Sequence, residues 1–437
     1  IIVALYTGKC FDAYAAIYAS IMSNNIWLPI SKEFPVERNI NIMDSASISI
    51  FFYDTELPEE MKTYLDNHNI TYTPFSSIKK EDSCEKFDFE SFDKDDIAYI
   101  MFTSGSTGAP KGVPITHENY INFIENALNI LPFGHCEVFA DFHDFAFDIS
   151  IFYLFSAIFV NGAISPIIEQ KDKVIPIIHI LENGITVWAS VPSVISQMMQ
   201  LYGKKKIDTQ IKIMFLCGEP FKLEVLDFCF SNMKLENVYN FYGLTETGVE
   251  NFYHCCEQVD LTRFKRFGMV PIGKPLPGND IDISDEKELL LAGCQITPGY
   301  LNGAEQEKFV KINEKVWYKS GDIVERYHDV YFCKGRLDSQ VKISGHRIEL
   351  LDIEANLIEY IKGITHAVCV VKKVCGRKMI IAMVISNHEL GVSEIQEKLL
   401  QHIPKYMVPQ RILFLDEFPV NANGKIDRQA MTDSIDL

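Results

Sequence analysis

Apolar-rich runs alternate with amphipathic stretches along most of the chain. Ile97–Phe102, Ile211–Leu216 and Val238–Tyr242 are short and rich in β-branched and aromatic residues, which is typical of buried strands. Phe11–Asn24 spaces its apolar residues as one face of a helix does. Strands that alternate with helices predict an α/β fold, with helices layered on a largely parallel sheet.

The pattern changes from about Val316, where short strands joined by tight turns are expected. Beyond them the spacing predicts two helices and two strands, at Leu350–Ile361, Ala367–Lys372, Met379–Ile385 and Val392–His402. This order is typical of a compact α+β module. We therefore expect two domains, 1–337 and 338–437, with the boundary near Asp338. Because the chain opens directly on the strand pattern IIVALY, we expect the first edge of the N-terminal domain to be missing.

The longest apolar segment, Phe145–Ile168, has the length of a membrane span, but polar residues and a proline interrupt it. The interruptions are Asp148, Ser150, Ser156, Asn161 and Pro166. A membrane span would rarely carry a carboxylate and so many other polar groups. We therefore expect a core helix with Asp148 at its entrance, and no membrane partner.

Composition and charge exclude further classes of partner. A chain of 437 residues is too long for one core, in agreement with two domains. The formal net charge of −18 argues against nucleic acid or an anionic membrane as the main partner. The eleven cysteines form no CxxC pair, so we expect reduced thiols and a cytoplasmic protein. His254, Cys255 and Cys256 are adjacent, without the gaps that zinc ligands need.

The first stretch with candidate chemistry is TSGSTGAPKG, from Thr103 to Gly112. It combines hydroxyl donors, two glycines that permit close backbone approach, and a lysine, directly behind a predicted strand. Such a loop can wrap a phosphate, and a polar hairpin turn is the alternative. The spacing does not match a Walker A motif. The candidate phosphate ligands are Thr103, Ser104, Gly105, Ser106, Thr107, Gly108 and Lys111.

Three more segments place reactive side chains next to predicted strands or turns. NFYGLTET, at Asn240–Thr247, offers an aromatic ring, a hydroxyl and a carboxylate, which can stack a base and hold Mg²⁺. KSGDIV and the following GRLD contain Asp322 and Arg336, and a fixed carboxylate suits ribose hydroxyls. NGKIDR places Lys425 on a glycine turn. Each segment alone could be an ordinary turn or helix cap, so the prediction rests on the order in which the segments follow one another along the chain.

In this order the segments resemble the motifs of the adenylate-forming enzymes, and within them the amino-acid adenylation domains of nonribosomal peptide synthesis and the D-alanine–carrier-protein ligases. The resemblance covers essentially the whole chain and rests on NIWLPI, FPVER, TSGSTGAPKG, FAFDIS, NFYGLTET, YKSGD, GRLDSQVKISGHRIE and NANGKIDR. One departure is Leu244, where the family usually has proline. The implied fold is a large N-terminal domain of layered sheets and helices with a small, mobile C-terminal α+β domain.

The resemblance implies the ATP-dependent activation of an amino acid. The substrate carboxylate attacks the α-phosphorus of ATP, pyrophosphate leaves, and an aminoacyl-adenylate remains. The phosphopantetheine thiol of a carrier protein then takes the aminoacyl group, and AMP departs. No carrier-like segment follows Arg428, so we expect a carrier protein that acts in trans or a carrier that lies outside the given sequence. The implied cofactors are ATP and Mg²⁺.

The resemblance assigns the nucleotide to residues from several segments. The loop from Thr103 to Lys111 closes over the β- and γ-phosphates, and Asp322 binds the ribose hydroxyls with Arg336 beside them. Tyr242 stacks on adenine. The rest of the implied nucleotide site consists of Asn240, Gly218, Glu219 and Gly243.

The implied catalytic residues lie in the nucleotide segment and near the end of the chain. Thr245 contacts the α-phosphate, and Glu246 helps to hold Mg²⁺. Lys425 reaches the substrate carboxylate and the nucleotide oxygens, which requires the small domain to fold over the large one. Asp338 is implied as the hinge that offers Lys342–Gly345 to the pantetheine arm.

Nine residues are implied as the substrate pocket, namely Asp148, Ile149, Phe152, Ala189, Phe215, Cys217, Phe241, Val249 and Glu250. Asp148 is expected to pair with the α-ammonium group of the substrate. The three phenylalanines are bulky and favour a small amino acid. Glu250 leaves an alternative open, because its carboxylate could pair with the second amino group of a basic amino acid, or could face solvent.

An acyl-CoA synthetase, which activates a non-amino carboxylic acid, shares most of these motifs and is the alternative function. Its substrate has no ammonium group to pair with Asp148. A carboxylate in such apolar surroundings is costly without a partner. Asp148 therefore favours an amino acid.

Overall fold

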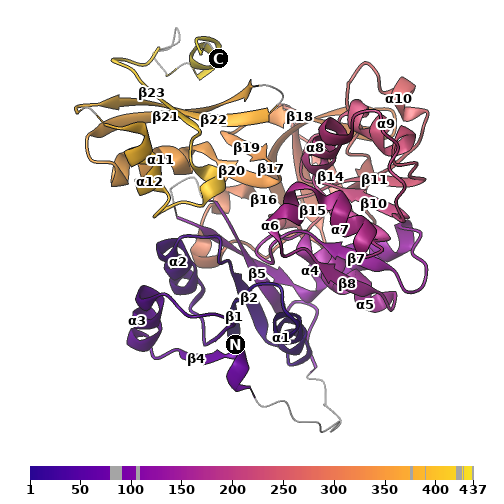
Figure 1. Cartoon of the computed structure of the whole chain (residues 1–437), viewed down its shortest axis with the longest axis horizontal. Coiled ribbons are helices and arrows are strands. Elements are labelled where there is room, and N and C mark those ends of the chain that lie inside the picture. Colours follow the sequence, from indigo (N-terminus) through magenta and orange to yellow (C-terminus); the bar gives the residue numbers. More distant parts are fainter. Residues whose placement is uncertain are drawn as a thin grey trace.

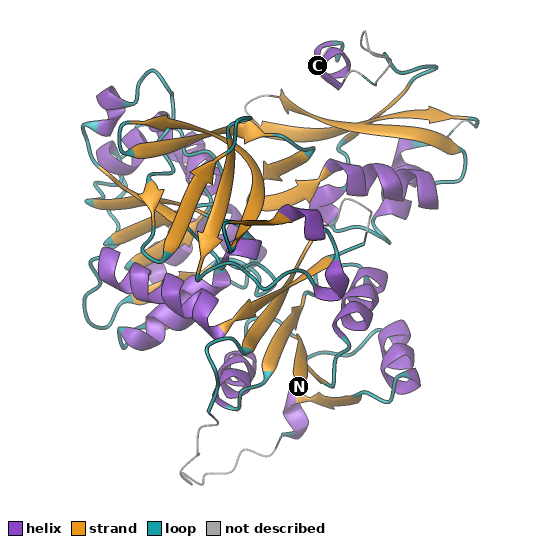
Figure 2. Cartoon of the chain, turned by 180° about the vertical axis from the view of Figure 1, so that it is seen from behind, coloured by secondary structure: helices purple, strands orange, loops and turns teal. Residues whose placement is uncertain are grey.

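The computed structural model describes residues 1–78, 91–104, 109–374, 377–388, 390–419, 426 and 428–435. The predicted α/β fold is confirmed: three sheets form a large N-terminal part, and a small α+β unit follows it (Figure 1). Seen from behind, helices flank the sheets of the large part (Figure 2). Among the described residues, no helix combines the length and the apolar character that crossing a bilayer requires.

The first sheet has six strands in the order β4-β3-β1-β2-β5-β6, and only the β5–β6 pair is antiparallel. Its strands are β1 (Ile2–Tyr6), β2 (Ile26–Ile30), β3 (Ile50–Tyr53), β4 (Thr71–Pro74), β5 (Ile97–Thr103) and β6 (Lys111–Thr116). The helices of this layer are α1 (Phe11–Met22), α2 (Val36–Ala46), α3 (Glu59–Asn67) and α4 (His117–Ile130). The strand β5 ends at Thr103, so the described start of TSGSTGAPKG lies at the carboxyl end of a strand that pairs in parallel with β2.

The second sheet has seven strands in the order β13-β12-β11-β10-β9-β7-β8. The five from β8 to β11 run parallel, and the last two are antiparallel. The strands are β7 (Val138–Asp141), β8 (Ala163–Pro166), β9 (Val187–Ser190), β10 (Ile213–Leu216), β11 (Asn237–Tyr242), β12 (Phe252–Cys256) and β13 (Lys274–Pro275). The helices are α5 (Ser150–Phe159), α6 (Gln170–Val174), α7 (Pro176–Glu182), α8 (Pro192–Tyr202), α9 (Leu223–Ser231) and α10 (Asp260–Arg263). Residues that follow β10 and β11 therefore emerge at one edge of the sheet.

The third sheet is antiparallel and begins earlier than the sequence pattern indicated. Its strands are β14 (Asn279–Ile283), β15 (Glu288–Gly293), β16 (Phe309–Ile312), β17 (Lys315–Tyr327) and β18 (Val330–Arg336). The expected change of pattern at Val316 thus falls inside this sheet, because β14 and β15 already belong to it. The strand β17 carries Asp322 toward the nucleotide segment.

The small unit has its own core, which confirms a small C-terminal α+β domain. It contains β19 (Gln340–Ile343), β20 (His346–Glu349), α11 (Leu350–Tyr360), β21 (Ile364–Val374), β22 (Arg377–Ser386), α12 (Val392–Leu399), β23 (Arg411–Phe414) and α13 (Arg428–Asp433). Ile353 and Leu357 of α11 pack with Cys369 of β21 and Leu399 of α12, all fully buried. Asp338 lies between β18 and β19, and the exact domain boundary there stays a prediction.

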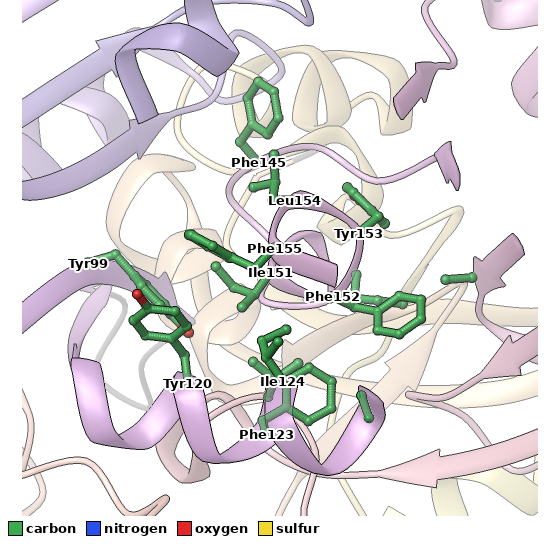
Figure 3. Close-up of a cluster of buried hydrophobic side chains, with 14 of the residues drawn as sticks. Tyr99, Tyr120, Phe123, Ile124, Phe145, Ile151, Phe152, Tyr153, Leu154 and Phe155 are labelled. Atoms are coloured by element: carbon green, nitrogen blue, oxygen red, sulfur yellow. The ribbon is translucent and has the colours of Figure 1, made fainter. Parts of the chain in front are cut away.

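The apolar segment at Phe145–Ile168 folds as a shorter helix than expected, because α5 ends at Phe159 and the chain continues into β8. Asp148 lies two residues before α5, at its entrance. Phe152 of α5 is fully buried and lies among the aromatic and aliphatic side chains that α5 and α4 share (Figure 3). This cluster fixes the position from which Asp148 is presented.

Candidate active site

One cavity of about 770 Å³ lies between the two parallel sheets and the small domain. It collects the ends of β5, β10 and β11, the turn before α5, and two segments of the small domain. Ligands of α/β proteins commonly bind beyond the carboxyl ends of parallel strands, and the volume suits a small-molecule site. Its lining includes Thr103, Ser104, Asp148, Ile149, Cys217, Gly218, Gly243, Leu244, Thr245, Val249, Glu250, Lys342, Ser344, Gly345, His346, Arg347, Lys405 and Tyr406.

The predicted phosphate loop reaches the cavity with its first residues, Thr103 and Ser104. Gly105, Ser106, Thr107 and Gly108 lie outside the described residues, as does Lys425. The Ser104 hydroxyl donates to the Arg347 carbonyl (3.2 Å), so this loop contacts the small domain. Lys111 is buried and forms an ion pair with Glu305. A phosphate role for Lys111 stays a prediction.

Thr245 and Asp148 meet in the cavity, although they come from different motifs. The Thr245 hydroxyl donates to Asp148 Oδ2 at 2.6 Å. Burial raises the pKa of the Asp148 carboxyl above its usual value, and the hydrogen bond and the charge of Lys342 offset only part of that effect. The nucleotide segment and the amino-acid segment of the sequence therefore form one site.

Glu246, the predicted magnesium ligand, is fully buried and already has two partners. The Tyr300 hydroxyl donates to Oε1 at 2.7 Å, and Arg347 of the small domain donates to Oε2 at 2.7 Å. Burial alone would raise the pKa of Glu246, but Arg347 and these hydrogen bonds hold it below its usual value. Glu246 is therefore an ionised carboxylate, and the small domain neutralises it in this arrangement.

The structure brings Tyr242, Asp322 and Arg336 together outside the cavity lining, and their nucleotide roles stay predictions. The Tyr242 hydroxyl donates to Asp322 Oδ2 at 2.6 Å, and Arg336 donates to Oδ1 at 2.8 Å. Arg336 also donates to both oxygens of Asp338 at 2.7 Å, which links Asp322 to the predicted hinge. The Lys342 ammonium lies 5.6 Å from the centre of the Tyr242 ring. Base stacking on Tyr242 stays a prediction.

The other predicted nucleotide residues differ in whether they line the cavity. Gly218 lines the cavity, whereas Asn240 is buried and donates its side-chain amide to the Pro271 carbonyl at 2.7 Å. The carboxylate of Glu219 accepts from two backbone N–H groups, those of Ser193 (3.1 Å) and Gly345 (2.8 Å). Glu219 thus binds the small domain, and Asn240 is not part of the cavity lining.

Lys342, Ser344 and Gly345, from the segment that the hinge hypothesis offers to the pantetheine arm, line the cavity. Gly345 has a φ of +83°, and an added Cβ there would lie 2.7 Å from Val191 Cγ1. Only glycine allows the segment to pack this closely. The hinge role of Asp338 itself stays a prediction.

The nine predicted pocket residues divide into two groups. Asp148, Ile149, Cys217, Val249 and Glu250 line the cavity. The other four, Phe152, Ala189, Phe215 and Phe241, are packed behind it in the core.

The phenylalanines do not fill the cavity, contrary to what their bulk suggested. The Phe215 ring stacks on Phe152 at 4.3 Å and on Phe241 at 4.2 Å between ring centroids. The three rings pack against one another between the sheet and the helix, so they lie behind the cavity and leave its volume free. These three residues therefore do not favour a small substrate.

Glu250 faces the cavity and not bulk solvent, which corrects the solvent-facing alternative. Only 5% of the residue is exposed. Burial raises the pKa of Glu250 to about 8, and the nearby charge of Asp148 contributes to the increase. A carboxyl with this pKa carries a proton at neutral pH unless a cation binds next to it.

Sequence reasoning assigned no individual role to Arg347, His346 or Tyr406, which the structure brings to the cavity. His346 stacks on Tyr406 at 3.8 Å between ring centroids, and contacts Phe147. His346 and Arg347 lie in the motif GHRIE, so the sequence already marked them as candidates. No motif marked Tyr406.

The raised pKa of Glu250 predicts a pH-dependent stability. The folded protein holds a proton that the unfolded chain, with a pKa near 4.5, releases between pH 4.5 and about 8. The free energy of unfolding therefore falls as pH rises through this window, by up to ~1.4 kcal/mol per pH unit. Glu250→Gln carries no such charge and is expected to unfold at a higher temperature than wild type above pH 8. Calorimetric scans across pH check this.

The matched control for this prediction is Glu257→Gln, which makes the same change at an exposed carboxylate nearby. It is expected to follow the wild-type curve. Parallel unfolding curves for wild type and Glu250→Gln would contradict a buried carboxyl at position 250.

Comparisons with known proteins identify the family of the chain. The family model "AMP-binding enzyme" matches residues 2–301, and "AMP-binding enzyme C-terminal domain" matches residues 352–425. The D-alanine--D-alanyl carrier protein ligase of Listeria monocytogenes serotype 4b is 30% identical over 96% of this chain and 86% of its own length. Tyrocidine synthase 3 of Brevibacillus parabrevis is 28% identical over 98% of this chain, which spans 7% of that protein.

A solved structure shares the fold. The Vibrio cholerae adenylation domain AlmE, in complex with glycyl-adenosine-5'-phosphate, superposes with a TM-score of 0.82 over 99% of this chain and 88% of that one, at 22% identity. The two family models together cover most of the chain, and one relative is 30% identical over nearly its full length. The chain therefore belongs to the AMP-binding enzyme family.

Proposed function

We propose that this protein activates an amino acid with ATP and transfers it to the phosphopantetheine thiol of a carrier protein. The observation that carries the proposal is the 2.6 Å hydrogen bond from Thr245 to Asp148, which joins the nucleotide segment to a carboxylate suited to an α-ammonium group. The relatives support it, since one is named a D-alanine--D-alanyl carrier protein ligase. We further propose a cytoplasmic protein whose carrier acts in trans, in keeping with the free thiols of its nine described cysteines.

The first half-reaction needs the two anionic reactants to be held together. Asp148 binds the ammonium group and so places the substrate carboxylate near Thr245, which is directed at the α-phosphate. Tyr242, Asp322 and Arg336 hold the nucleoside. Such positioning and charge stabilisation are the main contributions of a protein to phosphoryl and adenylyl transfer. Lys425 supplies the cation that the developing charge requires.

Glu246 fits a magnesium ion only when Arg347 has left it. Both its oxygens have partners in this arrangement, and within the described ranges no three acidic, histidine or cysteine side chains come together as a metal site. An ionised carboxylate is a suitable ligand for Mg²⁺, which takes its remaining ligands from water and phosphate oxygens. When bound, Mg²⁺ would neutralise phosphate charge. We therefore propose that the small domain moves between the half-reactions.

The second half-reaction suits the arrangement that the structure describes. Lys342, Ser344 and Gly345 lie at the cavity, and the Gly345 N–H is bonded to Glu219. The pantetheine arm would enter along this segment, and its thiol would attack the acyl carbon while AMP leaves. The domain rotation about Asp338 exchanges Lys342–Gly345 for Lys425.

Arg347→Met tests this exchange. The variant leaves Glu246 buried without its cation, but only in the described arrangement of the domains. A destabilisation of just ~1.4 kcal/mol lowers the population of that arrangement about tenfold. We expect the rate of thioester formation to fall roughly tenfold, with adenylate formation changed less than about threefold. The two rates are measured separately, by carrier loading and by pyrophosphate exchange.

Arg326→Met, at an exposed arginine of β17, serves as the control for this variant. It is expected to leave both rates unchanged. An equal loss of both half-reactions in Arg347→Met would argue against a role in domain exchange and for a simple structural role.

The reaction class is tested by ATP–pyrophosphate exchange with amino acids and with fatty acids. Exchange with at least one amino acid and none with fatty acids supports the proposal. Exchange with fatty acids alone, followed by acyl transfer to coenzyme A, would favour the acyl-CoA synthetase instead.

A further inference from the structure

The segment that carries Glu250 is held in a strained conformation. Val249, directly before it, has a φ of +80°, which is rare for a β-branched residue. The side-chain amide of Gln295 donates to the carbonyl oxygens of Gly248 (2.9 Å) and Glu250 (2.8 Å). At Gly243 an added Cβ would lie 2.1 Å from the Val249 carbonyl oxygen, so only glycine fits. Strain enforced by so many contacts is concentrated at functional sites.

This segment presents the Glu250 carboxyl on the cavity wall with part of its hydrogen-bonding capacity unused. Glu250 is 95% buried, and its Oε2 has no hydrogen-bond partner among the described residues. The thiol of Cys217 is the side chain that bonds to this carboxyl. Burying a hydrogen-bond acceptor without a partner costs free energy. A ligand that donates a hydrogen bond to Glu250 Oε2 removes this cost and is therefore bound more tightly.

Asp148 is a second carboxylate in the same cavity, close enough for its charge to raise the pKa of Glu250. The cation that acts on both carboxylates is Lys342. Lys342 belongs to β19 of the small domain, so it leaves the cavity when that domain moves. During adenylation, Asp148 and Glu250 then both face the substrate, and Lys342 is no longer next to them.

We infer that the pocket takes an α-amino acid with a second ammonium group on a short side chain, and that Glu250 selects this substrate. The inference rests on the proposed function, because it assigns the α-ammonium group to Asp148. The side-chain ammonium donates to Glu250 Oε2, and the Glu250 proton is released to solvent as this ion pair forms. Each carboxylate then has one cation.

The closeness of the two carboxylates limits the length of the side chain. Both line one cavity with Cys217, and Asp148 is close enough to Glu250 for its charge to raise the pKa of that carboxyl. A substrate that reaches both carboxylates therefore needs few bonds between its two ammonium groups. The side chains of 2,3-diaminopropionate, 2,4-diaminobutyrate and ornithine meet this condition.

The test is ATP–pyrophosphate exchange by the full chain with alanine, serine, the three short diamino acids, lysine, arginine and octanoate. Wild type is compared with Glu250→Gln, Glu250→Asp and the surface control Glu257→Gln. We expect wild type to prefer a short diamino acid. Glu250→Gln should lower kcat/KM for that substrate by at least about 30-fold, mainly through KM, and should lower the preference for it over alanine by a similar factor. Glu250→Asp should keep part of the preference, and Glu257→Gln all of it.

The outcomes separate this inference from the function on which it rests. A wild-type preference for alanine or serine, or an unchanged diamino-acid preference in Glu250→Gln, overturns the inference and leaves amino-acid activation standing. A preference for lysine or arginine overturns the short side chain. Exchange with octanoate alone overturns the proposed function as well. If Glu250→Gln does not fold, the wild-type panel and Glu250→Asp still decide.

Discussion

Asp148→Asn is expected to lower kcat/KM for amino-acid activation by about 10²–10³-fold, because a buried ammonium group left without its anion costs ~3–5 kcal/mol. Asparagine keeps the shape of the side chain and can still accept the hydrogen bond from Thr245, so the loss is one of charge. The variant should bind ATP as wild type does. Pyrophosphate exchange measures the first quantity, and calorimetric titration with ATP measures the second.

A deamino analogue of the preferred substrate provides the internal control. It has no ammonium group, so wild type should activate it poorly and Asp148→Asn should activate it no worse. Asp280→Asn, at an exposed carboxylate of β14, should behave as wild type. An Asp148→Asn enzyme that still discriminates between the amino acid and its deamino analogue as wild type does would assign the ammonium group to another residue.

The layered fold could be predicted because buried strands and amphipathic helices differ in period and composition. The strands β5, β10 and β11 lie within two residues of their predicted bounds. The third sheet was missed at its start, because β14 alternates two aspartates with two isoleucines and so resembles a polar connection. Such a strand is defined by its antiparallel partner β15, which only the tertiary structure supplies.

The candidate site could be predicted where a residue type and its place after a strand decide its role. Thr245 and Asp148 are examples, because each lies in a short motif that the backbone carries to the cavity. Glu246 is different: its partner Arg347 is 101 positions away, and only the docking of the small domain brings them together.

Glu250 shows a second limit of sequence reasoning. Its neighbours Val249 and Asn251 carry no pattern that separates a buried carboxylate from a solvated one. The positive φ of Val249 and the bonds from Gln295 turn the side chain toward the cavity. These are long-range constraints, so the sequence alone left the solvent-facing alternative open.

Lys425→Ala is expected to lower adenylate formation by about 10²–10³-fold, the usual effect of removing a preorganised donor from a transition state. Lys425 lies three residues before Arg428, which donates to both carboxylate oxygens of Glu354 (2.6 and 2.9 Å) on α11. Arg428 is thus bound to the small domain, the same domain that presents Lys342 and Arg347 at the cavity. ATP affinity and the unfolding temperature should change little. Pyrophosphate exchange and ATP titration check these expectations.

The decisive measurement supplies Lys425→Ala with the aminoacyl-adenylate and carrier protein directly, so that adenylate formation is bypassed. Thioester formation should then proceed within about threefold of wild type, because the transition state of that step is met by Lys342–Gly345. Lys398→Ala, at an exposed lysine of α12, is the control for a lost charge on the small domain. If Lys425→Ala loses both steps equally, the lysine stabilises the domain as a whole. If it loses only the first, the two half-reactions use different faces of one moving domain, and the bond between Arg347 and Glu246 belongs to the arrangement that Lys425 has left.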